Sequence, residues 1–329
     1  MGTGTETLAT ATRWGADFLA DLYRRYGHEL ADLDAVTGKV GDIGKSYDAE
    51  ERRVLYLMAR HVAPDVVFEF SPKRGWTTVH VAAALERNGK GRILSFELEP
   101  VYAWVARRTL RRAGLAHRAR FFVGDVREEL PPAYERLRAA GEIDGIQFLF
   151  IDSDHGGEFA RWYVDNLFPL VRPGGVIHVH DVVAAPERIV RGEASLREPT
   201  GEERVVAEHL VRHSDRYRSF SLADLVRDRA YLDAVRPLGG GAIALPPGRA
   251  AAYPTIQAVG FEPNPSLWIL NTGEQQADRY PGVKFPLLER TLAQKVRYAV
   301  TKRLAPVYAP IRELRRDIRQ RAKRRPARP

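Results

Sequence analysis

The chain has 329 residues, of which 44% are hydrophobic and 28% are charged, and it carries a formal net charge of +9. This balance is typical of a globular protein and excludes a disordered or fibrous chain, while the absence of cysteine excludes disulfides, thiolate nucleophiles and cysteine-ligated zinc. Because no apolar run reaches about 18 residues and the polar start lacks the features of a signal peptide, we expect a cytoplasmic protein.

The positive charge is concentrated at the end of the chain. Residues 312–329 contain nine basic and two acidic residues, so this tail carries +7 of the net charge of +9. The rest of the chain is close to neutral, which argues against a nucleic-acid-binding function for the protein as a whole.

Residues 1–62 are predicted to form a helical N-terminal segment. Trp14, Phe18, Leu22 and Tyr26 lie four residues apart, which is the spacing of one face of an amphipathic helix. A capping pattern at residues 48–51 then predicts the start of a second helix.

Residues 63–285 alternate between short apolar runs and amphipathic segments. The predicted strands cover 65–70, 92–97, 119–125, 148–152 and 174–181, and the predicted helices cover 76–87, 101–113, 132–140 and 158–167. This alternation predicts an α/β fold with a doubly wound, mostly parallel sheet and right-handed crossovers.

The pattern becomes irregular after the last of these strands. Residues 184–203 contain two prolines and two glycines and are predicted to be a long loop that serves as a lid or substrate wall. A helix at 203–213 and a late strand at 266–271 flank a second insert at 237–265, and 286–329 is predicted to be a basic helical or disordered tail.

Two of the predicted strands end in acidic and imidazole side chains. One run ends at Asp152 and is followed by Asp154 and His155, and the other ends at His180 and Asp181. Ligands of open α/β sheets bind beyond the carboxyl ends of the strands, so these side chains are candidates for one reaction centre. The carboxylates are hard ligands for a divalent cation, and an imidazole transfers protons near neutral pH.

These residues also have simpler interpretations. Asp152 and Asp154 could each cap the following helix, and His155 could be an exposed loop histidine. His180 could be a metal ligand or a hydrogen-bond donor to the ligands, and we interpret His178 as a packing residue.

The ends of the first three strands carry a second group of acids. Glu69 precedes a turn that contains Gly75, Glu97 ends the second strand, and Asp125 ends the third. A dinucleotide site would need the pattern G-x-G-x-x-G in this turn, and only Gly75 is present. The three acids instead suit three polar groups. Glu69 suits an ammonium group, Glu97 can accept hydrogen bonds from both hydroxyls of a ribose, and Asp125 can accept one from the amine of an adenine.

The stretch from about Val66 to Val183 resembles the class I S-adenosylmethionine-dependent methyltransferases, with Ser71 where the first glycine of the cofactor turn normally stands. Ile151-Asp-x-Asp-His155 and His180-Asp-Val182 resemble the divalent-cation-dependent small-molecule O-methyltransferases, especially the branch that acts on sugar hydroxyls of antibiotics and is related to cephalosporin-tailoring proteins. The chain departs from that branch at His180, where a carboxylate or amide is usual.

The resemblance implies a set of site residues. The cofactor S-adenosylmethionine would contact Glu69, Ser71, Gly75, Thr77, Glu97 and Asp125, with Ser71 and Thr77 acting through the backbone. Mg²⁺ or another divalent cation would be held by Asp152, His180 and Asp181, and His155 with Asp152 would carry catalysis.

The sequence therefore predicts methyl transfer to a hydroxyl of a small polar metabolite, with a sugar or glycosylated natural product as the favoured acceptor. One alternative is a nucleic-acid methyltransferase recruited by the basic tail, although the Asn/Asp-Pro-Pro-Tyr motif of base methylation is missing. The other is a non-catalytic methyltransferase-like binding protein, because the glycine turn is degraded.

The tail has its own candidate partner. Ile311, Leu314 and Ile318 form one stripe among arginines, so residues 311–329 are predicted to be a basic amphipathic helix at an anionic membrane surface. A solvated, partly disordered extension is an equal alternative because three prolines lie nearby, and RNA binding is a weaker one. A homo-oligomer also remains open.

Overall fold

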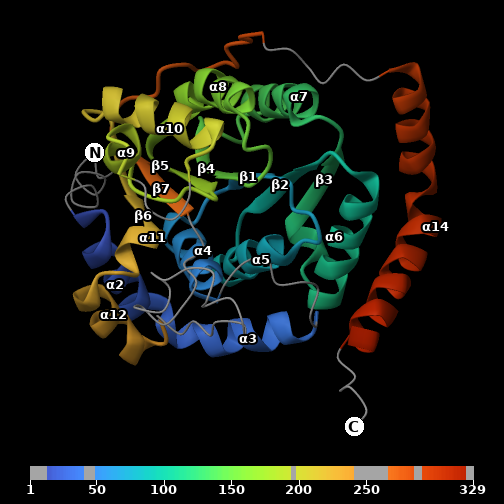
Figure 1. The fold of residues 1–329 in the computed structure, drawn as a ribbon, viewed down its shortest axis with the longest axis horizontal. Coiled ribbons are helices and arrows are strands. Elements are labelled where there is room, and N and C mark those ends of the chain that lie inside the picture. Colours follow the sequence, from blue (N-terminus) through green and yellow to red (C-terminus); the bar gives the residue numbers. More distant parts are fainter. Residues whose placement is uncertain (1–12, 41–48, 194–197, 241–265, 285–290, 324–329) are drawn as a thin grey trace.

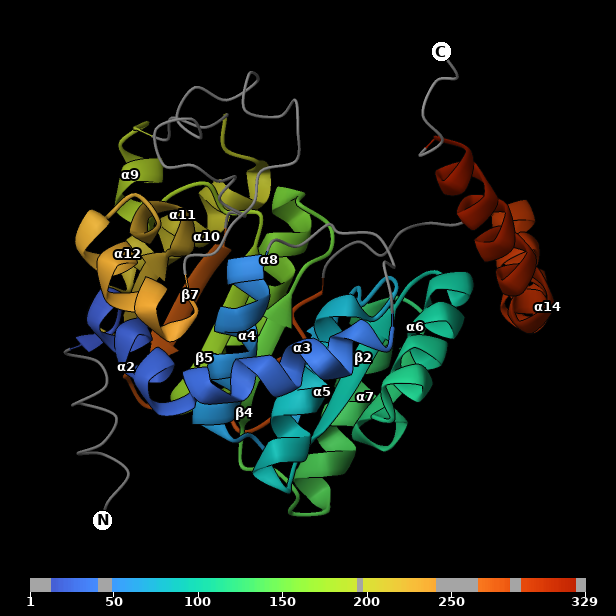
Figure 2. The same cartoon turned by 90° about the horizontal axis from the view of Figure 1, so that it is seen from below.

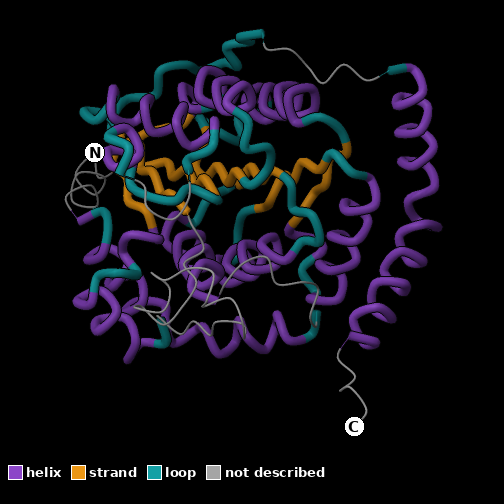
Figure 3. The backbone as a smooth tube through the Cα atoms, in the orientation of Figure 1, coloured by secondary structure: helices purple, strands orange, loops and turns teal. Residues whose placement is uncertain are grey.

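The computed structural model describes residues 13–323 except for 41–48, 194–197, 241–265 and 285–290. A central β-sheet lies between two layers of helices, and one long C-terminal helix lies outside them (Figures 1 and 3). Within the described residues, no helix combines the length and the apolar content that crossing a membrane requires.

The sheet has seven strands in the order β3-β2-β1-β4-β5-β7-β6. They are β1 (Val66–Phe70), β2 (Arg92–Glu97), β3 (Ala119–Val123), β4 (Ile146–Ile151), β5 (Val171–His180), β6 (Tyr217–Ser221) and β7 (Ser266–Asn271). The first five strands in this order, from β3 to β5, pair in parallel. Strand β7 is antiparallel to both β5 and β6. The predicted doubly wound, mostly parallel α/β sheet is confirmed.

Helices cover both faces of this sheet. They are α2 (Ala16–Tyr26), α3 (Leu30–Gly38), α4 (Ala49–Val62), α5 (Trp76–Asn88), α6 (Pro100–Ala113), α7 (Val126–Ala139), α8 (Gly157–Asn166), α9 (Pro186–Val190), α10 (Gly201–Arg212), α11 (Leu222–Leu225), α12 (Arg229–Val235) and α14 (Leu292–Lys323). The N-terminal helices lie with α5 on one face, and α7, α8 and α10 lie on the other (Figures 1 and 2).

Residues 148–151 of the central strand β4 are all apolar because both faces of the strand are covered. In β4, Phe148 and Phe150 pack toward the helices of the first face, whereas Leu149 and Ile151 pack toward those of the second. All four side chains are buried. From Phe148 the strand continues to Asp152 without a polar residue, and this apolar run made it visible in the sequence.

Several predicted boundaries differ from the structure. Helix α7 begins at Val126, six residues before the predicted start, because Asp125 caps it and accepts a hydrogen bond from the Arg127 amide. The predicted turn at 172–175 lies inside β5, where four residues protrude between the pairs Ile146–Val171 and Phe148–Val176. Strand β6 was not predicted, because its sequence Tyr-Arg-Ser-Phe-Ser is short and largely polar.

The prediction of one long loop at 184–203 is wrong in part. The segment contains α9 and the first turn of α10, which begins at Gly201 because Thr200 and Glu203 form a reciprocal capping box. Most of the predicted insert at 237–265 lies outside the described residues. The tail is helical over Leu292–Lys323 even though Pro306 and Pro310 lie inside this helix.

Candidate functional site

The site lies at the sheet edge formed by the carboxyl ends of the parallel strands. Asp152 directly follows β4, and His180 is the last residue of the neighbouring strand β5. His155 lies in the loop between β4 and α8, and Asp181 follows His180. The parallel pairing of β4 and β5 thus brings all four side chains to one place, as the sequence predicted.

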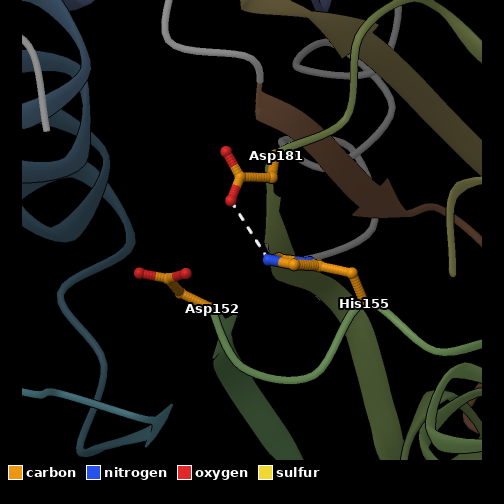
Figure 4. Close-up of side chains that lie close together, drawn as sticks. All are labelled: Asp152, His155 and Asp181. Carbon is orange, nitrogen blue, oxygen red and sulfur yellow. Dashed lines mark ion pairs between the residues drawn. The ribbon is translucent and has the colours of Figure 1, made fainter. Parts of the chain in front are cut away.

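Asp152, His155 and Asp181 form the tightest part of this cluster. One potential ligand atom from each residue lies within 4.8 Å of the others, and the three side chains point toward one another (Figure 4). The His155 Nε2 atom lies 3.1 Å from the Asp181 Oδ2 atom. Asp181 has a left-handed backbone with φ of 62°, a conformation that is sparsely populated for residues other than glycine and is often found at functional sites.

His180 lies against the same carboxylates from the buried side. Its Nδ1 atom is 3.3 Å from Asp152 Oδ1 and 3.4 Å from Asp181 Oδ2. Burial alone would lower the pKa of His180, but the nearby negative charges of Asp152 and Asp181 raise it to about 10. In the absence of a cation, His180 therefore behaves as a cationic partner of the two acids, and its role as a metal ligand remains a prediction.

Glu202 is a site residue that the sequence analysis missed. This buried carboxylate in the first turn of α10 lies 2.6 Å from His155 Nδ1 through Oε2, and it accepts a hydrogen bond from the Tyr163 hydroxyl through Oε1 at 3.0 Å. The Glu202 amide also donates to the His155 carbonyl at 3.0 Å. The capping pattern that begins at Thr200 could have located this helix start, but nothing in the sequence links it to His155.

The charges around His155 determine its protonation. Its hydrogen bonds with Asp181 and Glu202 raise the pKa of His155 to about 10. Burial would raise the pKa of Asp181, but the hydrogen bonds from His155 and His180 hold it well below its usual range. With both carboxylates charged, His155 is an imidazolium, so it can act as a base only when another positive charge compensates Asp181.

The turn after β1 has an unusual backbone that a cofactor site can use. Ser71 and Lys73 have positive φ values of 53° and 47°, and Gly75 has φ of 77° at the start of α5. The Ser71 amide donates to the Phe96 carbonyl at 2.9 Å. A Cβ on Gly75 would lie 3.0 Å from the Ala106 backbone, so only glycine allows this turn to pass so close to α6.

Glu69 and Thr77 are engaged inside the protein. The Glu69 carboxylate is fully buried and accepts hydrogen bonds from the hydroxyls of Ser95, Thr77 and Thr78, at distances of 2.7–3.2 Å. Burial raises the pKa of Glu69 to about 7. The structure therefore does not bring this carboxylate to the surface of the turn, where it was expected to meet the ammonium group of the cofactor.

Glu97 and Asp125 lie where the resemblance placed the ribose and adenine contacts. Glu97 accepts hydrogen bonds from the backbone amides of Lys73 and Glu99, both at 2.9 Å, and burial raises its pKa to about 7. Asp125 caps α7 and forms an ion pair with the Arg127 guanidinium at 2.7 Å. Glu97 thus ties the turn after β1 to the end of β2, which are the two elements that a nucleoside would contact.

The arrangement fits both groups that the resemblance implies. Two carboxylates and an imidazole converge as a divalent cation requires. The turn at 71–75 offers a closely approaching backbone beside the carboxylate of Glu97, as a nucleoside cofactor requires. Cation and cofactor would lie at the same edge of the sheet. Burial would raise the pKa of Asp152, but His180 lowers it, and Lys73 of this turn is near enough to lower it further.

Comparison with known proteins supports this assignment. Residues 73–182 match a family model described as a methyltransferase domain. The chain is 29% identical over 171 residues to a catechol O-methyltransferase of Niastella koreensis, which covers 50% of this chain and 71% of that protein. It is 32% identical over 135 residues to a catechol O-methyltransferase of Mycobacterium tuberculosis, which covers 41% of this chain and 56% of that protein.

Among solved structures, the O-methyltransferase TomG from Streptomyces achromogenes aligns with a TM-score of 0.46 and 18% identity, covering 74% of this chain and 89% of TomG. The sequence relatives agree with the resemblance to S-adenosylmethionine-dependent O-methyltransferases. The branch that acts on sugars and antibiotics remains a prediction.

Proposed function

We propose that the chain, which carries a class I S-adenosylmethionine-dependent O-methyltransferase domain, methylates one hydroxyl of a small acceptor that has two neighbouring hydroxyls. Asp152 and Asp181 would hold Mg²⁺ or another divalent cation, and His155 would accept the proton of the attacking hydroxyl. The observation that carries the proposal is the convergence of Asp152, His155 and Asp181 at the carboxyl edge of the sheet.

The contacts of His155 suit the role of a base. When the ring is neutral and donates Nδ1–H to Glu202, the lone pair of Nε2 faces the side of Asp181 and the site. The bound cation would supply positive charge that lowers the pKa of an acceptor hydroxyl. Glu202 and Tyr163 would fix the ring orientation, so that His155 receives the proton at Nε2 without reorientation.

The cofactor would bind along the turn at 71–75 and the end of β2. Glu97 would accept the ribose hydroxyls, and the backbone of the turn would approach the methionine part closely, as the positive φ values allow. The leaving group of methyl transfer is a neutral thioether, so the reaction needs no general acid.

The relatives and the sequence resemblance both favour an acceptor with vicinal hydroxyls. Two of the relatives are catechol O-methyltransferases by name, and the sequence resembles enzymes that methylate sugar hydroxyls. Catechols and many sugars present vicinal hydroxyls, which can bind a cation as a pair and leave one of them oriented for attack.

The test is formation of S-adenosylhomocysteine by the purified protein with S-adenosylmethionine and Mg²⁺. The panel contains catechol, a methyl glycoside with vicinal hydroxyls, and phenol and cyclohexanol as matched acceptors with one hydroxyl. We expect turnover with at least one diol, little with either single hydroxyl, and loss of turnover in excess EDTA that added Mg²⁺ restores. Full activity in EDTA would contradict the role of the metal, and tight cofactor binding without turnover on any acceptor would favour the binding-protein alternative.

A further inference from the structure

Helix α14 (Leu292–Lys323) has two different faces, and only one of them packs against the protein. The packed face is built from small residues: Ala309 is buried against Val101 and Val105 of α6. The Lys302 Nζ atom donates to the Val123 carbonyl at 2.8 Å. Figure 1 shows α14 lying outside α6, on the side of the molecule that carries β3.

The other face of α14 presents an aliphatic stripe to solvent. The stripe consists of Leu292, Val296, Val300, Leu304, Val307 and Ile311, whose exposed fractions range from 37% to 79%. Their spacings of 4, 4, 4, 3 and 4 residues place them on one side of the helix. Single exposed aliphatic residues are common on protein surfaces, but a continuous stripe of this length marks a contact surface.

The aliphatic stripe lies in a strongly basic helix. Residues 292–323 contain ten basic and two acidic residues. Arg297 and Arg303 stand beside stripe residues in the sequence, and both are exposed together with Arg315. Basic residues that flank an apolar stripe extend toward anionic headgroups while their aliphatic stems remain in contact with the apolar layer.

The spacing of the stripe argues against a coiled coil with a second copy of the chain. Its five steps span 19 residues, or about 3.8 residues per step, whereas a left-handed coiled coil needs an apolar residue every 3.5. Pairing two copies would also bring the basic flanks of both helices together, with only two acidic residues against ten basic ones in each helix. A partner surface with an apolar interior and a negatively charged outer layer would match both the aliphatic stripe and the basic residues of the helix.

We propose that α14 lies in the interface of an anionic lipid bilayer, with the aliphatic stripe inserted among the acyl chains and the flanking arginines at the headgroups. The sequence also predicted an anionic membrane as the partner of residues 311–329. The apolar contact proposed here begins about twenty residues before that segment, at Leu292. Val123, which Lys302 contacts, ends β3 at the same edge of the sheet as the candidate site. The docked helix therefore brings that edge close to the membrane.

The experiment is cosedimentation of the full chain with vesicles of phosphatidylcholine mixed with phosphatidylglycerol, and with vesicles of phosphatidylcholine alone. We expect binding to the mixed vesicles at low salt, weaker binding to the neutral vesicles, and release from the mixed vesicles as salt rises, because charge attraction is screened over roughly 10 Å at 0.1 M.

Two variants separate the contributions of stripe and charge. The triple variant Val300→Asn, Leu304→Gln and Val307→Asn removes apolar area without changing charge, and we expect at least about 100-fold weaker binding. The triple variant Arg297→Gln, Arg303→Gln and Arg315→Gln keeps the stripe, and we expect roughly 100-fold weaker binding to the mixed vesicles, at about one kcal/mol per arginine.

Val190→Asn is the matched control, since Val190 is exposed to 48% on α9, on a different part of the protein. It should bind vesicles like the wild type. Circular dichroism and binding of S-adenosylhomocysteine should be unchanged in all variants, which shows that the fold is intact.

Wild-type protein that ignores mixed vesicles at low salt would overturn the proposal. So would a stripe variant that binds as tightly as the wild type. If sedimentation showed instead a dimer that the stripe variant dissociates, with no vesicle binding, the stripe would be an interface between copies of the chain and the membrane assignment would be wrong.

Discussion

Two groups of acids lie at the same edge of the sheet, and their surroundings shift their pKa values in opposite directions. Asp152 and Asp181 contact the imidazoles of His155 and His180, and although burial opposes the effect, the pKa of both acids is lowered. Glu69 and Glu97 contact only neutral donors, namely hydroxyls and backbone amides, and burial raises the pKa of both to about 7.

The difference indicates two functions for similar side chains. Carboxylates that remain charged beside imidazoles can exchange those partners for a cation, which suits a reaction centre. Carboxylates held by hydroxyls and amides keep a fixed geometry, which suits the frame of a cofactor site. The predictions below test whether the two groups separate in this way.

His155→Gln should cause the largest change. Removing a general base costs about 100- to 10,000-fold in turnover, while the affinity for S-adenosylhomocysteine should stay within about twofold because the turn at 71–75 is untouched. Asp154→Asn is the matched control, since Asp154 only accepts a hydrogen bond from the Gly156 amide at 2.9 Å. Equal losses in the two variants would remove His155 from the chemistry.

Glu97→Ala should show the reverse behaviour. We expect the affinity for S-adenosylhomocysteine to fall by about 1 to 3 kcal/mol, the scale of hydrogen bonds to a charged group, as measured by calorimetry. Glu99→Ala is its control because this neighbouring side chain is exposed. If both variants bind as tightly as the wild type, with the fold intact, Glu97 does not contact the cofactor.

Glu202→Gln tests the residue that orients His155. Loss of a carboxylate that supports a reacting imidazole costs about 10- to 100-fold, so kcat should fall and KM for the acceptor should change little. Glu208→Gln on the exposed side of the same helix is the control. Since Glu202 also influences the charge of His155, the pH profile of turnover should shift, which a purely structural role would not produce.

Glu69→Gln should have the smallest effect on turnover, and its effect on stability should depend on pH. The folded-state pKa of about 7 exceeds the ordinary value of 4.5, so the stability of the wild type is greatest when Glu69 is protonated and declines as pH rises from 4.5 through 7. Each unit of pKa corresponds to about 1.4 kcal/mol. We expect the variant to gain about 2 kcal/mol relative to the wild type between pH 5 and 8 in urea unfolding.

A difference in unfolding free energy that stays constant over this pH range would contradict the assignment of the raised pKa to Glu69. Comparing the two proteins at each pH removes the contributions of other titrating groups, because these are common to both.

The sequence predicted most of the sheet and the meeting of Asp152, His155 and Asp181 because both depend on strong local signals. Apolar runs such as that before Asp152 can only be strands covered on both faces, and the order of strands brings their ends together. Glu202 escaped prediction because its contact with His155 bridges 47 residues and depends on where α10 packs. The burial of Glu69 escaped for a similar reason, since it follows from hydroxyls on β2 and α5.

The aliphatic stripe of α14 was seen only at its end, from Ile311 onward. The prolines at 306 and 310 argued against a continuous helix before that point, yet the helix passes through both. The sequence alone could not tell which side of α14 faces α6, so the outward direction of the stripe needed the structure.

The most direct test of the central claim is Mn²⁺ binding to the purified chain, measured by calorimetry and by the paramagnetic resonance of free Mn²⁺. The account predicts one bound ion per wild-type chain, loss of binding in Asp152→Asn and in Asp181→Asn, and wild-type binding in Asp165→Asn, an exposed acid on α8. A wild type that binds no ion, or Asp152 and Asp181 variants that bind it as tightly as the wild type, would contradict the assignment of this sheet edge as a metal-assisted reaction centre.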